Sequence, residues 1–358
     1  MATQHHDLAD DPEARPVTAG ALADYLRTQA TEFLRALRRH RESGGAAGAE
    51  PDSVGAARAL RRAARRISGS LHTYRPLLDS DWSEEMRPEL AWVSGTLALE
   101  HAHEARLERL LLALQRLSGA VPVPAQAVEG PAPGPARRPG AAATAAERGN
   151  LTVGAAKAGA LLERQLTLAR TRAHSTALQA LGSSRFHAVT DRVALLASDV
   201  PLAPAAASAD LRPLAEAARE RLADGVAALP LVTAGSPYNA EALVHGLSPD
   251  PAPHPQDAPW HQVRLLLRLH RYAREVVHGG REGAAPGDVR LFQAGQALDR
   301  HRDASEAAAA AAQAARTSRI APATAYALGV LHADQRHEVE AARFAFQRCW
   351  QREAVSAG

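Results

Sequence analysis

Cysteine, lysine and aromatic residues are all scarce in this sequence. Cys349 is the only cysteine among 358 residues, and Phe, Trp and Tyr together make up 4%. A single cysteine excludes an intramolecular disulfide and any metal site built from several thiolates. The shortage of aromatic residues argues against a β-sandwich or β-barrel, whose strands favour aromatic and β-branched side chains.

The basic residues are 41 arginines and one lysine, Lys157. A Walker-type nucleotide site needs lysine between glycine and serine or threonine, whereas Lys157 stands between two alanines, so this site is excluded. Schiff-base chemistry is nearly as unpromising, because it has a single candidate residue. The net charge of +3 is too small to indicate nucleic-acid binding by itself.

Long apolar runs are also missing. No stretch of about eighteen uncharged, strongly apolar residues is present, so no membrane span is predicted. Residues 1–16 are polar and acidic and are followed by no apolar segment, which argues against a signal peptide. We therefore expect a cytoplasmic protein with no membrane partner.

Alanine is abundant, with 82 residues, and apolar residues recur at steps of three and four. Such a composition favours long helices that pack closely through small side chains. We predict helices over 21–40, 53–77, 83–117, 144–181, 184–198, 210–229, 260–278, 288–317 and 322–352. Nothing in the sequence indicates a strand, so the predicted fold class is all-α.

The predicted helices divide into two bundles of about four each. We expect a disordered tail over 1–16, a first bundle over 17–200 and a second over 207–352. The first bundle contains a Pro-, Gly- and Ala-rich loop at 118–143. A weak internal repeat, offset by about 200 residues, suggests that the two bundles are related by pseudo-symmetry.

The predicted helix at 53–77 has one apolar and one basic face. The apolar stripe consists of Leu60, Ala64, Ile67, Leu71, Tyr74 and Leu78. The opposite side carries Arg58, Arg61, Arg62, Arg65 and Arg66, and no acidic residue occurs between Asp52 and Asp79. On this pattern alone, an arginine-rich face in water is the favoured interpretation and an anion site is the alternative.

The predicted helix at 260–278 carries one polar stripe: His261, Arg264, Arg268, Arg271 and Glu275. Most of its remaining circumference is apolar, which predicts a mostly buried helix. Because a buried unpaired charge is very costly, its arginines must face water, an anion or carboxylates of neighbouring helices. The pattern leaves a wet basic groove and interhelical ion pairs equally open.

Four segments, taken in order, resemble the CHAD family, the conserved-histidine α-helical domain. They are the basic helix motif at 57–66, the Tyr-Arg-Pro-Leu-Leu run at 74–78, a second basic helix motif at 261–272 and the Leu-x-x-x-x-Asp-Ala motif at 298–304. Arg58 occupies the place of the family's first histidine, and Asp299 occupies that of a glycine.

This resemblance implies two four-helix bundles around a basic cavity that binds inorganic polyphosphate. It implies binding residues at Arg58, Arg61, Arg65, Arg66, His261, Arg264, Arg268, Arg271 and His301. Rows of guanidinium groups suit a flexible polyanion because each group forks onto phosphate oxygens. The protein would then be located at polyphosphate granules.

The histidines do not have the spacing of metal ligands. His101 and His103 point to different sides of a helix, and His332 and His337 are five residues apart. No Gly-x-Ser-x-Gly elbow is present, and the Glu-x-Glu-x-Lys motif of triphosphate tunnel enzymes is absent. Cys349, beside Trp350, is expected to be buried packing. We therefore expect no catalytic residue, no metal and no cofactor.

Two other functions remain open. The first is a scaffold that binds a protein partner and keeps its arginines in structural ion pairs. The second is nucleic-acid binding through the basic groove, which is less favoured because few aromatic residues accompany the arginines.

Overall fold

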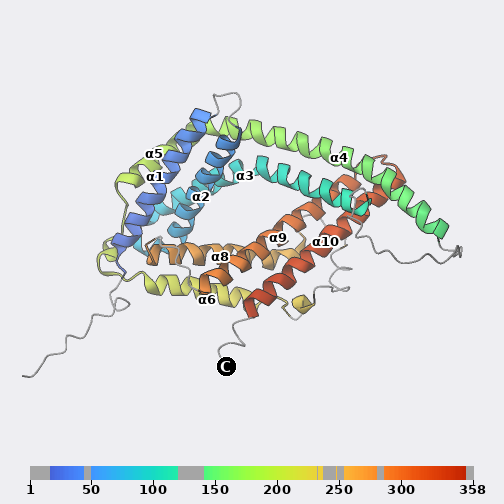
Figure 1. Cartoon of the computed structure of the whole chain (residues 1–358). Coiled ribbons are helices and arrows are strands. Elements are labelled where there is room, and N and C mark those ends of the chain that lie inside the picture. The colour runs from blue at the N-terminus through green and yellow to red at the C-terminus, as the bar shows by residue number, and fades with distance from the viewer. Residues whose placement is uncertain are drawn as a thin grey trace, which may run out of the picture. The chain divides into compact units, whose positions relative to one another are not determined.

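The computed structural model describes residues 17–43, 50–119, 141–231, 233–236, 247, 254–279 and 286–351. In these residues the chain forms nine α-helices, four short 3-10 helices and one isolated β-bridge, between Leu78 and Leu202, but no strand (Figure 1). The all-α prediction is confirmed. The predicted tail at 1–16 and most of the predicted loop at 118–143 lie outside the described residues.

The helix bounds agree with the predicted helices to within a few residues. The α-helices are α1 (Ala19–Ser43), α2 (Glu50–Thr73), α3 (Ser80–Leu117), α4 (Ala141–Leu181), α5 (Ser184–Ser198), α6 (Arg212–Ala227), α8 (Ala258–Val277), α9 (Pro286–Ala315) and α10 (Pro322–Gln351). The 3-10 helices are η1 (Arg75–Leu77), η2 (Pro204–Ser208), η3 (Thr233–Gly235) and η4 (Pro255–Asp257). The helix predicted to reach residue 77 ends at Thr73, because Pro76 has no N–H to continue it.

The chain forms two compact units, each assembled from three segments. The first unit contains Met1–Leu97, Ala180–Asp224 and Leu266–Gly283. The second unit contains Ala98–Gln179, Gly225–Leu265 and Ala284–Gly358. The boundaries fall inside α3, α4, α6 and α8, so these helices contribute residues to both units. The two bundles proposed from the order of the sequence remain a prediction.

The first unit is built on the packing of α1 against α2 and α5 (Figure 1). The apolar stripe predicted for α2 is buried along its whole length, from Leu60 to Leu78. Leu22, Leu26 and Phe33 of α1 are buried as well, at spacings of four and seven residues. Because this stripe faces the core, the arginines of α2 are directed to the other side of the helix.

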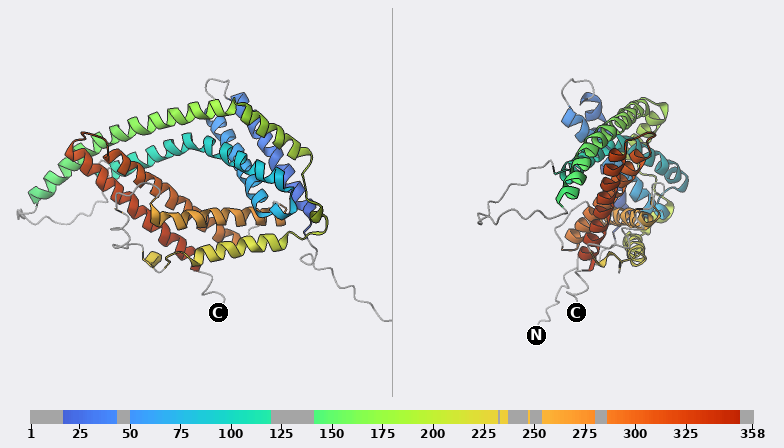
Figure 2. Two further views of the ribbon diagram at one scale, coloured as in Figure 1. Left: turned by 180° about the vertical axis from the view of Figure 1, so that it is seen from behind. Right: turned by 90° about the vertical axis from the view of Figure 1, so that its right-hand side faces the viewer.

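The core of the second unit depends on alanine, as the composition predicts. α9 and α10 run alongside each other in both views of Figure 2. Their buried residues pack with those of α3 and α4 in one cluster: Leu110, Ala113, Leu114, Ala155, Ala158, Leu162, Leu166, Ala307, Ala311, Ala314, Ala327, Leu328 and Leu331. Small side chains of this kind let helix backbones approach closely.

The closest approach is at Gly154 of α4, where a Cβ atom would overlap the carbonyl oxygen of Ala323 at the start of α10. We predict that Gly154→Ala lowers the free energy of unfolding by about 1–3 kcal/mol, because a backbone atom cannot turn away as a side chain does. Gly329→Ala in α10 is the matched control, since a Cβ atom there meets nothing within 4 Å. The control should raise stability by about 0.5–1 kcal/mol. Urea unfolding followed by circular dichroism measures both, and a neutral Gly154→Ala would contradict this packing.

Candidate functional site

The arginines of α2 form a graded row in the first unit. Arg58 and Arg62 are exposed, whereas Arg61 and Arg65 are half-buried. The Nε atom of Arg65 donates a hydrogen bond to the carbonyl oxygen of Arg61 at 3.2 Å. This bond holds the base of the Arg65 side chain along the helix surface.

Arg66 is fixed by a carboxylate. Its Nε and Nη2 atoms donate to Glu275 of α8 at 2.7 and 3.1 Å, and the hydroxyl of Tyr25 in α1 donates to the same carboxylate at 2.7 Å. Burial opposes the charge of Arg66, but the hydrogen bonds and the charge of Glu275 outweigh it and raise the pKa of Arg66. The pKa of the Tyr25 hydroxyl is raised by burial and by the charge of Glu275. Glu275 therefore joins three helices of the first unit, and Arg66 is part of a structural ion pair.

α8 packs closely against α2 within the first unit. A Cβ atom on Gly69 would lie 2.6 Å from the Tyr272 ring, and the Tyr74 hydroxyl donates to the carbonyl oxygen of Ala273 at 2.9 Å. Arg268 and Arg271 on this part of α8 are half-buried. The basic rows of α2 and α8 in the first unit therefore belong to two helices in direct contact.

α8 is less buried than its apolar circumference predicts. The buried residues are Trp260, Val263, Leu267, His270, Ala273 and Val276. Leu265, in contrast, is 44% exposed. The prediction of a mostly buried helix is thus wrong, because α8 is covered only in part and the rest of its apolar surface meets water.

In the second unit, Arg264 of α8 is paired with Asp299 of α9. Its Nε atom lies 2.5 Å from the Asp299 carboxylate, and its side chain is 13% exposed while that of Asp299 is 59% exposed. Asp299 stands where the resembled family has glycine. This chain thus supplies its own anion to one of the predicted binding arginines.

His301 lies in a buried polar network of the second unit that the sequence analysis did not predict. The centre of this network is Asp257, the last residue of η4. Its carboxylate accepts hydrogen bonds from Arg336 at 2.7 and 3.2 Å, from Arg343 at 2.7 Å and from the Ser305 hydroxyl at 2.5 Å. These three partners come from α9 and α10, so Asp257 fixes the chain just before α8 to both helices.

The histidines of the second unit are in contact with this network. His301, 1% exposed, accepts a hydrogen bond at Nε2 from the Nε atom of Arg343 at 3.3 Å. Its ring stacks on Trp260, with centroids 5.6 Å apart, and meets the edge of His261 at 5.4 Å. His301 is therefore placed to orient His261, which is half-buried, and does not itself reach the surface.

Burial and charge set the protonation states of these groups. Burial alone would raise the pKa of Asp257, but the hydrogen bonds and the charge of Arg336 outweigh it and lower this pKa from 3.8 to about 2. Burial, followed by the charge of Arg343, lowers the pKa of His301 well below 6.5. Burial also lowers the pKa of His261. Both histidines are therefore neutral at pH 7, and the Asp257 carboxylate is ionised.

A sequence signal for this network exists in α10. Arg336, Glu340 and Arg343 follow one another at steps of four and three, on the helix side that also carries the buried Val339 and Phe346. Charged residues that share a periodicity with core residues indicate a buried ion pair. Their partner Asp257 could not be assigned in the same way, because it lies some 80 residues away, next to a proline-rich segment.

Two further properties concern the described part of the chain as a whole. Among these residues no group of three or more His, Cys, Asp or Glu could hold a metal ion. None of the helices found there is both long enough and apolar enough to cross a membrane.

An all-α chain with basic rows on α2 and α8 and a histidine pair beside α8 defines a helical protein with a candidate anion site. Comparison with known proteins assigns this class to a family: the CHAD domain profile matches residues 28–312, and the chain belongs to the CHAD family. The chain is also similar to a solved structure, PptA from Streptomyces chartreusis. The two are 67% identical with a TM-score of 0.75, over 94% of this chain and 100% of that one. No curated protein sequence matches significantly.

The buried network makes a prediction about stability. Asp257→Asn leaves the buried Arg336 and Arg343 without their shared counter-ion, so the free energy of unfolding should fall by about 3–5 kcal/mol. Asp299→Asn breaks an ion pair whose carboxylate is exposed and should cost at most about 1 kcal/mol. Urea unfolding of both variants measures the difference, and equal costs would contradict the central role of Asp257.

The same carboxylate sets a pH dependence. Because its pKa is lower in the folded than in the unfolded chain, Asp257 contributes stability that is complete above about pH 4 and is lost as the pH falls towards 2. The contribution is about 2 kcal/mol. The stability difference between the wild type and Asp257→Asn should therefore shrink over this interval.

Proposed function

We propose that this protein binds inorganic polyphosphate, or a polyanion of similar charge density, without catalysis. The observation that carries the proposal is the α2 helix, which bears Arg58, Arg61, Arg62 and Arg65 and has no acidic residue between Asp52 and Asp79. Membership of the CHAD family supports it, since the motif resemblance implies polyphosphate binding on these helices. A location at cytoplasmic polyphosphate granules is part of the proposal.

The predicted binding residues take different roles in it. Arg58, Arg61 and Arg65 of α2, with Arg268 and Arg271 of α8, are the proposed phosphate ligands of the first unit. Arg66 supports them, because its bond to Glu275 fixes α2 against α8. Guanidinium groups held at the surface of packed helices bind phosphate oxygens with little loss of freedom.

In the second unit, His261 and Arg264 are the proposed ligands, and His301 acts through His261. Arg264 must exchange Asp299 for a phosphate, which an exposed carboxylate allows because water readily replaces it. His261 is neutral at pH 7 and offers a hydrogen bond; near a polyanion or at lower pH it gains a charge.

Binding through several arginines should be steeply salt-dependent. We expect the affinity for long-chain polyphosphate to fall by at least about tenfold between 50 and 200 mM salt, because several phosphates are neutralised. Arg61→Gln with Arg65→Gln should weaken binding and flatten this salt slope by about one to two contacts. Fluorescence anisotropy of labelled polyphosphate measures both, and orthophosphate assays of the same mixtures should show no hydrolysis.

The matched control for this experiment lies in the same unit. Arg35→Gln with Arg39→Gln removes two charges with the same spacing from the exposed side of α1. It should leave the salt slope unchanged. Equal losses in both double variants would mean that binding follows net charge alone, and a flat salt response of the wild type would refute the proposal.

A pH dependence follows from His261. Its pKa is lowered by burial, so it gains a proton only as the pH falls below its ordinary value near 6.5. At constant ionic strength, affinity should rise by up to about fivefold from pH 7.5 to pH 5.5, equivalent to one added ion pair of about 1 kcal/mol. His261→Gln should bind at pH 7.5 much as the wild type does and should lack the rise. An unaltered rise in this variant would exclude His261 as its source.

A second function is favoured by two ion pairs. Arg66 with Glu275 and Arg264 with Asp299 are the contacts expected of a scaffold whose arginines are structural. In that case polyphosphate should not bind even at low salt, and protein partners become the subject. Competition with DNA of equal charge separates a polyphosphate site from a general polyanion site, since only the former resists the competitor.

A further inference from the structure

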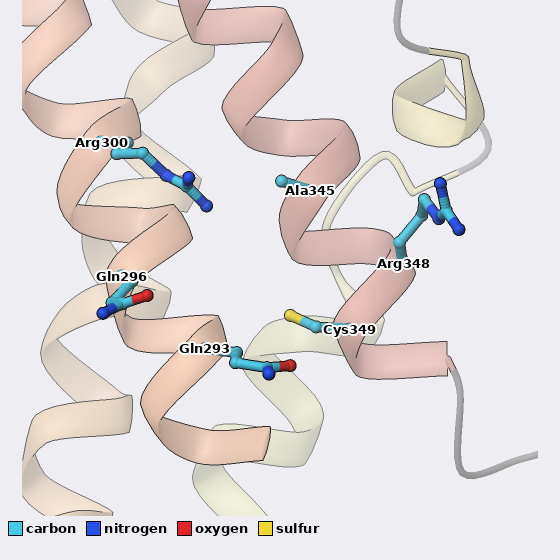
Figure 3. A pocket seen from close by; sticks show the side chains of 6 residues that line it. All are labelled: Gln293, Gln296, Arg300, Ala345, Arg348 and Cys349. Carbon is cyan, nitrogen blue, oxygen red and sulfur yellow. The ribbon is translucent and has the colours of Figure 1, made fainter. Parts of the chain in front are cut away.

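A hollow lies between α9 and α10 in the second unit, away from the predicted binding residues. It is lined by Gln293, Gln296, Arg300, Ala345, Arg348 and Cys349 (Figure 3). Its volume is about 210 Å³, several times the volume of about 30 Å³ that one water molecule takes in the liquid. The hollow therefore has room for a small ligand of one or two phosphoryl groups.

Helix periodicity explains why these side chains meet. Gln293, Gln296 and Arg300 recur at steps of three and four along one side of α9, and Ala345 and Cys349 do the same on α10. In Figure 3 the Arg300 side chain reaches from α9 toward α10, and the sulfur of Cys349 faces α9. Ala345 keeps the space between them open because its side chain ends at Cβ. Arg348 is on the outer side of α10 at the rim.

The lining of this hollow is cationic and contains no carboxylate. Within the part of the chain that the structure describes, neither Arg300 nor Arg348 has an Asp or Glu within ion-pair distance; the recorded contact of Arg348 is the ring of Phe344. The nearest acidic residues along α9 are already engaged, Asp299 with Arg264 and Asp303 with Arg302. The charge of this hollow is therefore not neutralised within the protein.

A third guanidinium lies close to the same place. Arg290 stacks over the ring of Trp350, 4.3 Å from its centroid, next to Cys349 in the chain. Burial lowers the pKa of Arg290, and the proximity of Cys349 opposes this change. Arginine at both ends of the hollow, with amide groups of Gln293 and Gln296 between them, is an arrangement that suits an oxyanion.

We propose that this hollow is a separate anion site, which takes one phosphate or the two phosphoryl groups of pyrophosphate. Arg300 and Arg348 supply the charge, and the two glutamine amides donate hydrogen bonds to the remaining oxygens. The inference does not rest on polyphosphate binding at α2 and α8, because it shares no residue with that site. The ligand can come from free phosphate or from the end of a polyphosphate chain.

Cys349 gives a direct test in the native protein. It is the only cysteine, and it is half-buried in the hollow, more accessible than the buried packing residue that the sequence predicted. Its alkylation by iodoacetamide, followed by mass spectrometry, therefore reports on this site alone. The reagent is uncharged, so it does not itself compete for an anion site.

Orthophosphate and pyrophosphate should slow this alkylation, by about tenfold at a concentration ten times the dissociation constant. Potassium chloride at equal ionic strength should not. Arg300→Gln with Arg348→Gln should abolish the protection, whereas Arg35→Gln with Arg39→Gln should preserve it. Equal slowing by chloride, no slowing by either phosphate, or unchanged protection in the Arg300 and Arg348 variant would each overturn the proposal.

The same assay with long-chain polyphosphate distinguishes the two sources and the two sites. Protection by orthophosphate that persists in the Arg61 and Arg65 variant supports an independent site for free phosphate. Greater protection by polyphosphate at equal chain-end concentration in that variant supports binding of the polymer end. Protection by the polymer only, lost in that variant, would assign the effect to α2 and overturn this inference.

If Cys349 does not react in the folded protein, calorimetry decides. Pyrophosphate titrated into the wild type should bind at one site more than in the Arg300→Gln, Arg348→Gln variant. An identical stoichiometry in the two proteins would overturn the proposal.

Discussion

The high cost of burying a guanidinium without a counter-ion governs the placement of arginine in this protein. With 41 arginines in the chain, some must lie where helices pack, and each such place needs a carboxylate. Glu275 meets this need for Arg66 in the first unit, and Asp257 meets it for Arg336 and Arg343 in the second. Both carboxylates belong to α8 or to the turn just before it, so α8 is held near each end by a buried or half-buried ion pair.

Between these two fixed points α8 carries His261, Arg264, Arg268 and Arg271. Their backbone is held by packing and ion pairs, which keeps the side chains in a set arrangement along the helix. The alanine-rich core contributes in a different way. Small side chains at the helix contacts let backbones approach closely, as at Gly154, and leave the larger charged residues for the outer sides of the helices.

The structure also divides the arginines by role in a way that a basic composition alone does not reveal. Arg66, Arg336 and Arg343 are structural, since each is bound to a buried or half-buried carboxylate. Arg264 is intermediate, because the partner it holds is exposed and replaceable. Arg300 and Arg348 share a hollow without a carboxylate. A ligand that competes for arginine therefore meets three different situations in one chain.

The sequence by itself determined the helices, the all-α class and the buried stripe of α2, because periodicity and proline positions are local properties. Its motifs also sufficed for the CHAD family. Only the tertiary structure decided which arginines are paired, because their partners Glu275, Asp299 and Asp257 are far away in the sequence or on other helices. The partial exposure of α8 and the burial of His301 were decided in the same way, since a helix pattern does not tell which side another helix covers.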